Sequence, residues 1–499
     1  MPTPTPFRSI AHPLTLPLPI YVPQQGHVAD SGSPGAMRNR ATAGDDRKDN
    51  RRDEDIDPSI VPADALKHPG PRHRIVIVGG GAGGLELAAR LGDDLGRHEE
   101  AEIVLVDLAL THLWKPLLHE VAAGTLGPHE NEFDYLQQAR DHRFRFQLGR
   151  LEAIDRKRKE IWLAPLVGDD GMEVAPHRSL TYDTLVIAIG AIDNDFNTPG
   201  VREYAHSLND KDDAQRFHRR LLALCARSEM VSAAPVRVVI VGGGATGVEL
   251  AAELSSAVDV IASYGVELKE LRRPVHITLT ELAPRLLGAL PEEVARRVHE
   301  DLEQRGIAVR VGQKVESVDA GGVVLAGGER IDADLTVWAA GIQGQSILKT
   351  LGDLETNRLG QLIVRRTLQT TRDEDIFAMG DCSNCIAPEG TRPPPPTAQA
   401  ASQQAQLLAQ SLPRRLAGKP LLEFTYHERG SIVSLGGDEA IGKVSTRGRD
   451  VTIQGRLARL TYWALYRRHL NLLLGTVRTA LMTVGQWLSR RSQPRVKLH

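Results

Sequence analysis

The sequence is poor in several features that would mark particular classes of protein. It has only three cysteines, Cys225, Cys382 and Cys385, too few for a disulfide framework and in keeping with a reducing compartment. It contains no run of 18 apolar residues, so no transmembrane helix is evident. Four prolines break the early apolar stretch, which argues against a secretory signal. The net charge of −2 argues against nucleic acid as a main partner, and no set of metal ligands is apparent.

The remaining composition is that of an ordinary soluble protein. At 499 residues, with 41% apolar and 25% charged residues, the chain is long enough for two or three domains. Residues 1–70 differ from the rest. They are rich in Pro, Gly, Asp and Arg and have few periodic apolar positions, which predicts a disordered N-terminal extension.

One stretch of 18 residues occurs twice. RIVIVGGGAGGLELAARL begins at Arg74 and RVVIVGGGATGVELAAEL begins at Arg237, and the two agree at 14 positions. Each reads as a buried strand, a G-x-G-x-x-G turn and a helix, the pattern of a dinucleotide-binding unit. The first glycine makes the tight turn, the second admits the pyrophosphate, and the third lets the helix pack on the strand. These glycines are Gly79, Gly81 and Gly84 in the first copy and Gly242, Gly244 and Gly247 in the second.

An acidic residue ends the next strand in each copy. Asp107 lies 23 residues after Gly84, near the usual distance for a carboxylate that binds a ribose, and Glu281 lies 34 residues after Gly247. A carboxylate there binds both ribose hydroxyls and repels a 2′-phosphate, so the second site is expected to prefer NADH to NADPH. The nearby Arg285 is a caution, because an arginine can accommodate that phosphate.

Further buried strands end in small residues at Gly190, Gly341 and Asp381, where a nucleotide could approach closely. Asp381 follows a glycine and is placed either to bind a flavin ribityl chain or to cap a helix. Residues 112–126 predict a loop that opens into a helix beside the cofactor, with Lys115 in the loop. His112 and His119 in this segment are candidates for catalysis, although lone histidines are more often ordinary hydrogen-bonded residues.

The C-terminal part begins with four prolines, 393–396, followed by a predicted helix on which Gln399 and Gln403 share a face. That face could meet a polar ligand or simply be solvated. Residues 451–499 contain no Asp or Glu and nine Lys or Arg, interleaved with Trp, Tyr and Leu. Gly475 is expected to split them into two short helices. The composition favours an amphipathic segment on an anionic membrane surface, with a dimer interface or a nucleic-acid patch as alternatives.

Taken in order, these motifs resemble the type II NADH:quinone oxidoreductases, single-chain enzymes also called alternative NADH dehydrogenases. The resemblance covers about residues 72–499 and rests on both glycine motifs, HLWKPLLHEVAAG, YDTLVIAIGAIDNDFNTPG, FAMGDC and the A-Q-x-A-x-Q pattern at Ala398–Gln403. It implies FAD held by the first glycine motif with Asp107 and Asp381, and NADH held by the second with Glu281. It places Glu249 near the meeting point of nicotinamide and flavin, and it implies quinone contacts at Gln399 and Gln403.

We therefore expect an α/β fold with two Rossmann-like dinucleotide-binding domains. The FAD-binding domain is expected at 71–190 and 330–396, the NADH-binding domain at 191–329, and a quinone-site helix with an amphipathic membrane-anchoring region at 397–499. The expected activity is transfer of hydride from NADH to FAD and of two electrons to a membrane quinone, without proton pumping. The protein is expected at the cytoplasmic face of the inner membrane as a peripheral protein, and a homodimer is left open.

Two alternatives use the same motifs differently. A related FAD enzyme of the disulfide reductase type, such as a sulfide:quinone or ferredoxin reductase, would need a redox cysteine pair, for which Cys382 and Cys385 are the candidates. A non-catalytic protein that senses NAD(H) or acts as a membrane scaffold would have an empty first site and would be colourless when purified.

Overall fold

The computed structural model describes residues 72–127, 131–168, 170–232, 234–264, 275–386, 393–437, 439–446 and 449–489. The predictions for residues 1–70 and for the basic residues beyond 489 lie outside this range. The short antiparallel pair β8 (Leu166–Val167) and β9 (Glu173–Ala175) belongs to a separate unit, which includes Pro165–His177. The other described residues, from His73 onward, form one compact unit.

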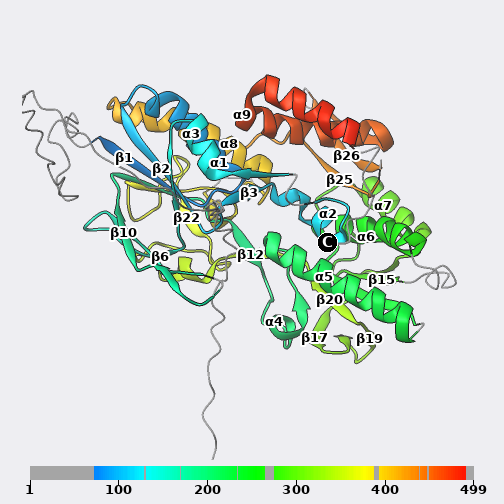
Figure 1. Cartoon of the computed structure of the whole chain (residues 1–499). Helices are drawn as coiled ribbons and strands as arrows, with labels where there is room; N and C mark the ends of the chain where they lie inside the picture. Colours follow the sequence, from blue (N-terminus) through cyan, green and yellow to red (C-terminus); the bar gives the residue numbers. More distant parts are fainter. Residues whose placement is uncertain are drawn as a thin grey trace, which may run out of the picture. The chain divides into compact units, whose positions relative to one another are not determined.

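A parallel five-stranded sheet carries the first glycine motif. Its strand order is β23-β11-β1-β2-β5, with the central β1 paired to β11 on one side and β2 on the other. Helix α1 connects β1 to β2, and α8 packs along α1 (Figure 1). The bounds are β1 (His73–Val78), α1 (Ala82–Leu91), β2 (Ala101–Asp107), α3 (Tyr135–Asp141), β5 (Arg145–Leu148), β11 (Thr184–Ile187), β23 (Ile376–Ala378) and α8 (Ala398–Leu416).

The second glycine motif lies in a second sheet built in the same way. The strand order is β13-β20-β14-β15-β16, again all parallel, and β14 occupies the central place that β1 has in the first sheet. The expectation of an α/β fold with two parallel sheets is confirmed. The bounds are β13 (Ala205–His206), α5 (Lys211–Arg227), β14 (Val236–Val241), α6 (Ala245–Tyr264), β15 (Val275–Thr280), α7 (Glu292–Gln304), β16 (Ala308–Arg310) and β20 (Leu335–Trp338).

One sequence-based boundary needs correction. The sequence predicts that the NADH-binding domain ends at residue 329, yet β20 at Leu335–Trp338 pairs with β14 in the second sheet. The chain returns to the first sheet only at β23. The cause is that a buried strand ending in small residues has the same sequence pattern in either sheet. LTVWAAG alone therefore does not show which of the two sheets the strand joins. The other domain boundaries stay predictions.

Short antiparallel pairs and small helices complete these layers. Strands β12 and β21 pair with each other and lie in the two stretches of chain that connect one sheet to the other. Strand β3 pairs with β4 beside the first glycine turn. The remaining elements are β3 (Thr111–Leu113), α2 (Leu118–Ala123), β4 (Glu132–Asp134), β6 (Leu151–Asp155), β7 (Glu160–Leu163), β10 (Arg178–Thr181), β12 (Ala191–Asp193), α4 (Val201–Tyr204), β17 (Val315–Asp319), β18 (Gly322–Leu325), β19 (Arg330–Asp332), β21 (Ile342–Gly344), β22 (Leu362–Val364) and β24 (Ser383–Cys385).

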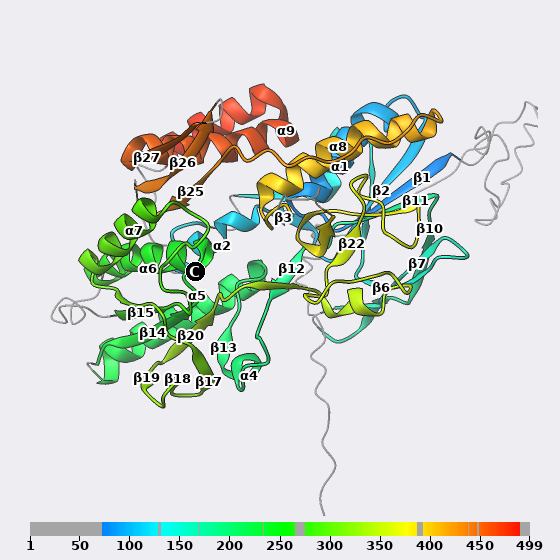
Figure 2. The same cartoon turned by 180° about the vertical axis from the view of Figure 1, so that it is seen from behind.

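The C-terminal part is a three-stranded antiparallel sheet followed by a helical hairpin, and the two lie side by side in both views (Figures 1 and 2). Gly475 (φ 74°, ψ 168°) interrupts α9, and Arg467 on the first arm donates to Gln486 on the second at 2.6 Å. The predicted split into two helices is confirmed, whereas the sheet was not foreseen. The bounds are β25 (Gly430–Ser434), β26 (Ala440–Thr446), β27 (Arg449–Gln454) and α9 (Gly455–Ser489).

The hydrophobic cores show how the pieces are joined. One core lies under the first sheet and includes Tyr466, Leu470 and Leu473 of α9, which are almost fully buried. A second core lies under the second sheet and includes Leu118 and Val121 of α2. The segment HLWKPLLHEVAAG therefore runs from the first core to the second, which accounts for its length and for its mixture of aromatic and small residues.

Candidate functional site

The first glycine turn has the geometry that its sequence predicts. Gly79 adopts φ +104°, and a Cβ atom on Gly84 would lie 1.8 Å from the Gly79 carbonyl oxygen, so neither position accepts a side chain. A Cβ on Gly81 would meet nothing within 4 Å. The turn is thus tight on its inner side and open at its second glycine, which is where a pyrophosphate must approach the backbone.

The second turn repeats this arrangement at its three motif glycines. Gly242 adopts φ +115°, a Cβ on Gly247 would lie 1.9 Å from the Gly242 carbonyl oxygen, and a Cβ on Gly244 would meet nothing within 4 Å. Both turns also lie at the carboxyl ends of their central strands, the edge at which open parallel sheets bind ligands. The chain therefore has two equivalent sites shaped for phosphates.

The two strand-end acids fix these turns. Asp107 accepts a hydrogen bond from the Gly80 amide at 2.5 Å, and Glu281 accepts one from the Gly243 amide, also at 2.5 Å. Burial raises the pKa of Asp107. Arg285, the caution raised by the sequence, donates to the carbonyl oxygens of Leu290 at 2.9 Å and of Gly288, so its guanidinium is already engaged in holding its own loop.

The other residues predicted around the first turn also gather at its edge of the sheet. Asp381 follows β23 in a short 3-10 helix, and its pKa is raised by burial and lowered in part by the charge of Lys115. Lys115 donates to the Ala191 carbonyl at 3.1 Å. Gly190 adopts φ +69° with open space around it, and a cavity of about 150 Å³ lies beside Gly380 and Asp381. Backbone freedom, one cation and one buried acid thus meet where a flavin would extend from the turn.

Gly341 takes the corresponding place in the second unit. It follows β20 and adopts φ +85°, and a Cβ there would lie 3.1 Å from the ring of Phe196. The tightness comes from a side chain and not from the backbone, in contrast to Gly242.

Glu249 is buried between three elements. Its Oε1 accepts from the Ser434 amide at 3.0 Å, and its Oε2 lies 3.5 Å from His119 Nδ1. Burial raises its pKa to about 8, so the carboxyl holds a proton at neutral pH. The matching Glu86 of the first copy instead pairs with Arg90 at 2.9 Å in its own helix. The structure separates two glutamates that the repeat alone could not distinguish.

Gln399 and Gln403 both hydrogen-bond to the main chain of residues 427–430, where β25 begins. Gln403 donates to the His427 carbonyl at 2.8 Å and accepts from the His427 amide at 3.0 Å. Gln399 donates to the Gly430 carbonyl at 3.1 Å and accepts from the Arg429 amide at 2.8 Å. The two side chains share a face, as predicted, and that face is covered by main chain rather than by solvent.

Both cysteines of the proposed redox pair are poorly suited to disulfide chemistry. Cys382 and Cys385 are buried free thiols. Burial raises the pKa of Cys382 to about 12 and that of Cys385 to about 11, so neither forms the thiolate that attacks a disulfide. Cys382 instead contacts the carbonyl oxygens of Ile187 and Met379 at 3.4 and 3.2 Å.

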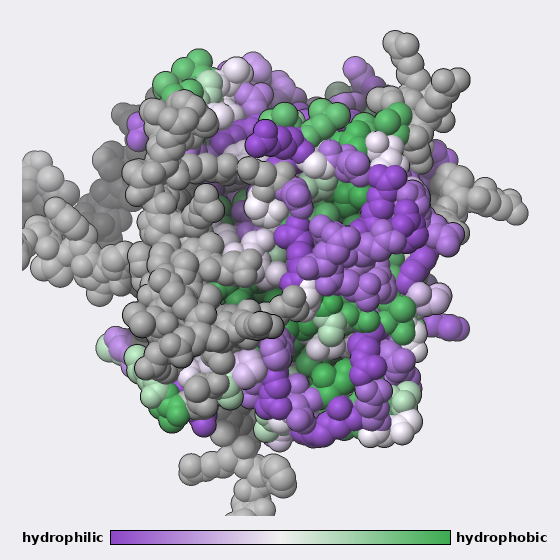
Figure 3. Space-filling model, turned by 90° about the vertical axis from the view of Figure 1, so that its right-hand side faces the viewer, coloured by the Kyte–Doolittle hydropathy of each residue, from purple (hydrophilic) through white to green (hydrophobic). Residues whose placement is uncertain are grey.

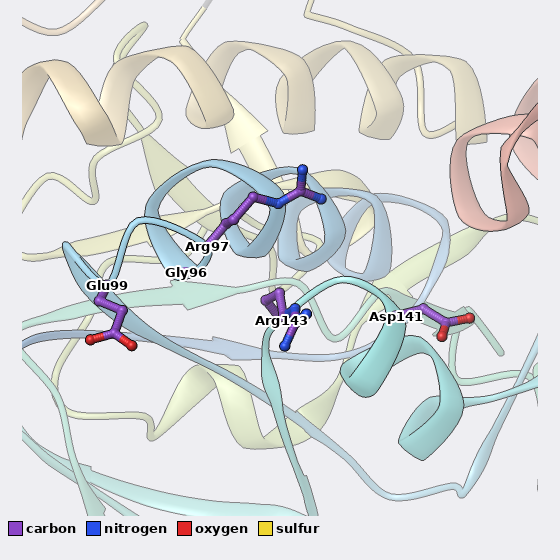
Figure 4. Close-up of a pocket in the computed structure, with 5 residues that line it drawn as sticks. All are labelled: Gly96, Arg97, Glu99, Asp141 and Arg143. Carbon is purple, nitrogen blue, oxygen red and sulfur yellow. The ribbon is translucent and has the colours of Figure 1, made fainter.

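A wider cavity lies away from these residues. It measures about 570 Å³ and is lined by charged side chains (Figure 4). Its residues precede β2 and β5, so it lies at the amino ends of the strands, opposite the glycine turn. The lining residues are Gly96, Arg97, Glu99, Asp141 and Arg143. Its position separates it from both glycine turns.

Several residues near these sites were missed by sequence reasoning. Ser434 reaches Glu249, Tyr135 donates its hydroxyl to the Gly80 carbonyl at 2.8 Å, and His469 contacts His112. Their partners are distant in sequence, so no local signal could reveal them. The two histidines proposed as catalytic candidates lie apart, His112 on the first turn and His119 on Glu249.

Comparison with known proteins agrees with this geometry. The family model described as pyridine nucleotide-disulphide oxidoreductase matches residues 73–405, two-thirds of the chain. A type II NADH:quinone oxidoreductase from Haemophilus influenzae is 40% identical over 443 residues, covering 85% of this chain and 99% of that protein. The chain belongs to the type II NADH:quinone oxidoreductase family.

More distant relatives and solved structures also align over most of their own length. One from Staphylococcus aureus is 29% identical over 380 residues, covering 75% of this chain and 90% of that protein. Among solved structures, NDH2 from Plasmodium falciparum in complex with NADH has the same fold, with a TM-score of 0.71 at 18% identity and coverage of 85% of this chain and all of that one. A sulfide:quinone oxidoreductase from Aquifex aeolicus follows with a TM-score of 0.62 at 20% identity, covering 81% of this chain and 92% of that one.

Proposed function

We propose that this chain is a NADH:quinone oxidoreductase that transfers a hydride from NADH to FAD and two electrons to a membrane quinone, without pumping protons. The observation that carries the proposal is the pair of equivalent phosphate turns in one compact unit, each with a strand-end acid on its central amide. A single nucleotide site would explain only one of them. When bound, FAD supplies the chemistry that converts a two-electron hydride donor into an electron source for a quinone.

The residues divide between the two nucleotides. We assign FAD to the first turn, where Gly79, Gly81 and Gly84 are joined by Asp107, Gly190, Asp381 and Lys115. We assign NADH to the second turn, where Gly242, Gly244 and Gly247 are joined by Glu281 and Gly341. Asp381 and Lys115 favour FAD at the first site, since a buried acid and a cation near the turn suit the hydroxyls and polar ring of a flavin. The engaged Arg285 favours NADH over NADPH at the second.

We assign the quinone end of the reaction to α8, and we keep Glu249 of α6 near the meeting point of nicotinamide and flavin. Quinone reduction with NADH consumes one proton in addition to the hydride, and Glu249 holds a proton at neutral pH. We assign Gln399 and Gln403 to the wall of the quinone site. Their amides are bonded to main chain, so we infer that they shape that wall by holding residues 427–430 in place.

We also propose that the chain is a peripheral protein at the cytoplasmic face of the inner membrane, bound to anionic lipid through α9. None of the described helices is long and apolar enough to cross a bilayer. The space-filling view shows hydrophobic surface broken by hydrophilic residues along its upper edge (Figure 3). Large apolar side chains are exposed along β27 and both arms of α9, namely Val451, Leu457, Leu460, Leu465, Val477, Leu481 and Val484.

The decisive experiment compares two substitutions at matched glycines. Neither Gly81 nor Gly244 has a left-handed φ, and a Cβ atom added at either position would meet nothing within 4 Å. Valine at either position should therefore leave the fold intact and occupy the space of the phosphates. We expect Gly81→Val to be purified without the yellow flavin absorbance and without any activity. We expect Gly244→Val to stay yellow and to lose flavin bleaching by NADH under anaerobic conditions.

The control is Gly84→Ala, which places a Cβ against the Gly79 carbonyl and should reduce thermal stability itself. Circular dichroism separates that outcome from loss of cofactor. A yellow Gly81→Val protein, or a Gly244→Val protein that is bleached by NADH as fast as the unchanged chain, would overturn the division of sites.

A further inference from the structure

The C-terminal helix reaches the first glycine turn through two histidines to which the proposed reaction assigns no role. His112, in the middle of β3, has its Nδ1 2.9 Å from the Gly80 carbonyl oxygen. Its Nε2 lies 3.2 Å from Nε2 of His469 on α9. A residue 357 positions away in sequence thus contacts the side chain that holds the turn.

The hydrogens of this chain can be assigned. A carbonyl oxygen only accepts, so Nδ1 of His112 carries the hydrogen and donates it to Gly80. Burial lowers the pKa of His112 to about 4 and that of His469 to about 3, so each ring carries a single hydrogen at neutral pH. Nε2 of His112 is therefore an acceptor, and Nε2 of His469 is the donor. His469 fixes the tautomer that His112 needs in order to bind Gly80.

The ring of His469 is itself held in place. Trp114 stacks on it with ring centroids 5.8 Å apart and on Tyr466 at 5.1 Å. Leu470, the next residue of the same arm, is fully buried in the first core. The donor is thus presented by a packed helix face rather than by a free side chain.

The anchored carbonyl controls the amide that faces the cofactor site. In a trans peptide the carbonyl of one residue and the amide of the next point in opposite directions within one plane. Holding the Gly80 carbonyl inward therefore directs the Gly81 amide outward, to the open side of the turn. In the second turn the Gly243 carbonyl accepts from the main-chain amide of Leu287 at 2.8 Å, and α9 takes no part.

We propose that His469 is a positioning residue for the flavin: through His112 it orients the Gly80–Gly81 peptide toward the FAD pyrophosphate, so that the C-terminal helix contributes directly to FAD retention. The proposal rests on the assignment of FAD to the first turn. It gives α9 a second task besides any contact with lipid, and it confines that task to one of the two nucleotide sites.

The test measures FAD affinity and not turnover. Flavin-free protein is titrated with FAD and followed by quenching of flavin fluorescence. His469→Phe should weaken FAD binding by roughly fivefold, the value of one buried hydrogen bond, because the Tyr135 hydroxyl still holds the same carbonyl. His469→Gln, whose amide can donate at a similar reach, should bind FAD within about twofold of the unchanged chain, taking twofold as the scatter of such energies.

Two controls separate positioning from packing. Leu470→Ala weakens the docking of the same arm but keeps the histidine pair, so it should lower thermal stability and leave FAD affinity nearly unchanged. In a His112→Asn background, where the asparagine amide can reach Gly80 but not His469, adding His469→Phe should have no further effect. NADH binding, measured by its own fluorescence, should be equal in all variants and shows that each is folded.

Equal FAD affinity in His469→Phe and the unchanged chain would overturn the proposal, as would an equal loss in Leu470→Ala or an additive double variant. Failure of the underlying assignment looks different, because the unchanged chain would then bind no FAD or would bind it equally well with Gly81→Val.

Discussion

At the scale of single residues, the two copies of the repeat have diverged in their helices and not in their turns. The same glutamate of the motif is buried in both copies, but Glu86 pairs with Arg90 of its own helix in the first, whereas burial raises the pKa of Glu249 to about 8 in the second. The neighbours decide the difference, since Glu86 lies next to the Arg90 guanidinium and the Gln406 amide, whereas Glu249 faces Ser434 and His119. A buried carboxyl group whose pKa is raised into the neutral range lowers the free energy of unfolding measurably as the pH rises.

This pH dependence gives a prediction for Glu249→Gln. Burial raises the carboxyl pKa to about 8 in the folded chain, while an exposed glutamate ionises near pH 4.3. Between these values the folded state holds a proton that the unfolded state has lost, so stability falls as pH rises, by at most about 1.4 kcal/mol per pH unit. Thermal denaturation from pH 5.5 to 8.5 should show a shallower decline for the glutamine variant. Parallel curves for the two proteins would contradict the buried-acid assignment.

At the scale of elements, α9 has an inner and an outer face. Ala458, Tyr462, Tyr466 and Leu470 recur every four residues and are buried, which is the spacing of one helix face. Leu460 on the first arm and Leu481 on the second are 67% and 68% exposed, so they face away from the core. Their contribution to stability should be small, and their contribution to any contact with lipid should be large.

We therefore expect Leu460→Glu combined with Leu481→Glu to reduce co-sedimentation with anionic vesicles at least tenfold while changing the melting temperature little. Each change removes an apolar side chain that would be buried in the lipid, and that burial is worth about 1.5–3 kcal/mol of binding free energy. Each change also adds a negative charge facing negative headgroups. The matched control is Asn471→Glu, an exposed polar position on the first arm. Unchanged sedimentation of the double variant would refute α9 as the membrane contact.

Many of the helices and strands could be predicted from the sequence, because the strand, turn and helix of each glycine motif are local patterns. The split of the last helix at Gly475 was readable for the same reason. The sheet β25–β27 was not, since β25 and β26 each contain a glycine and none of the three strands carries a long apolar run. The place of β20 and the pairing of His112 with His469 were not readable either, because both depend on segments brought together only by the complete fold.

At the scale of the whole molecule, the C-terminal region is part of the folded body. Tyr466, Leu470 and Leu473 belong to the core beneath the first sheet, and β27 is an edge of the three-stranded sheet. Removing residues 451–499 would expose these surfaces. We expect such a truncated chain to lose more than 5 kcal/mol of stability, since each buried large side chain is worth about 2–5 kcal/mol when deleted, and to be recovered as aggregate or without flavin.

A soluble, yellow, truncated protein with a melting temperature near that of the full chain would contradict this integration. The measurement also decides how vesicle experiments should be designed. Loss of sedimentation after truncation reports on folding as well as on lipid contact, whereas surface substitutions on α9 report on lipid contact alone.

The backbone of Gly475 sets how broadly the molecule can rest on a flat surface. Its φ of 74° with ψ of 168° is a conformation that residues with side chains avoid. With a side chain there, the 35 residues of α9 would favour a single rod of about 52 Å at 1.5 Å per residue, and one arm would extend away from the protein. The turn at Gly475 instead places the two helical arms next to each other, so that both can contact the same flat surface. The absence of a Cβ atom at Gly475 thus favours a helical hairpin over one extended helix.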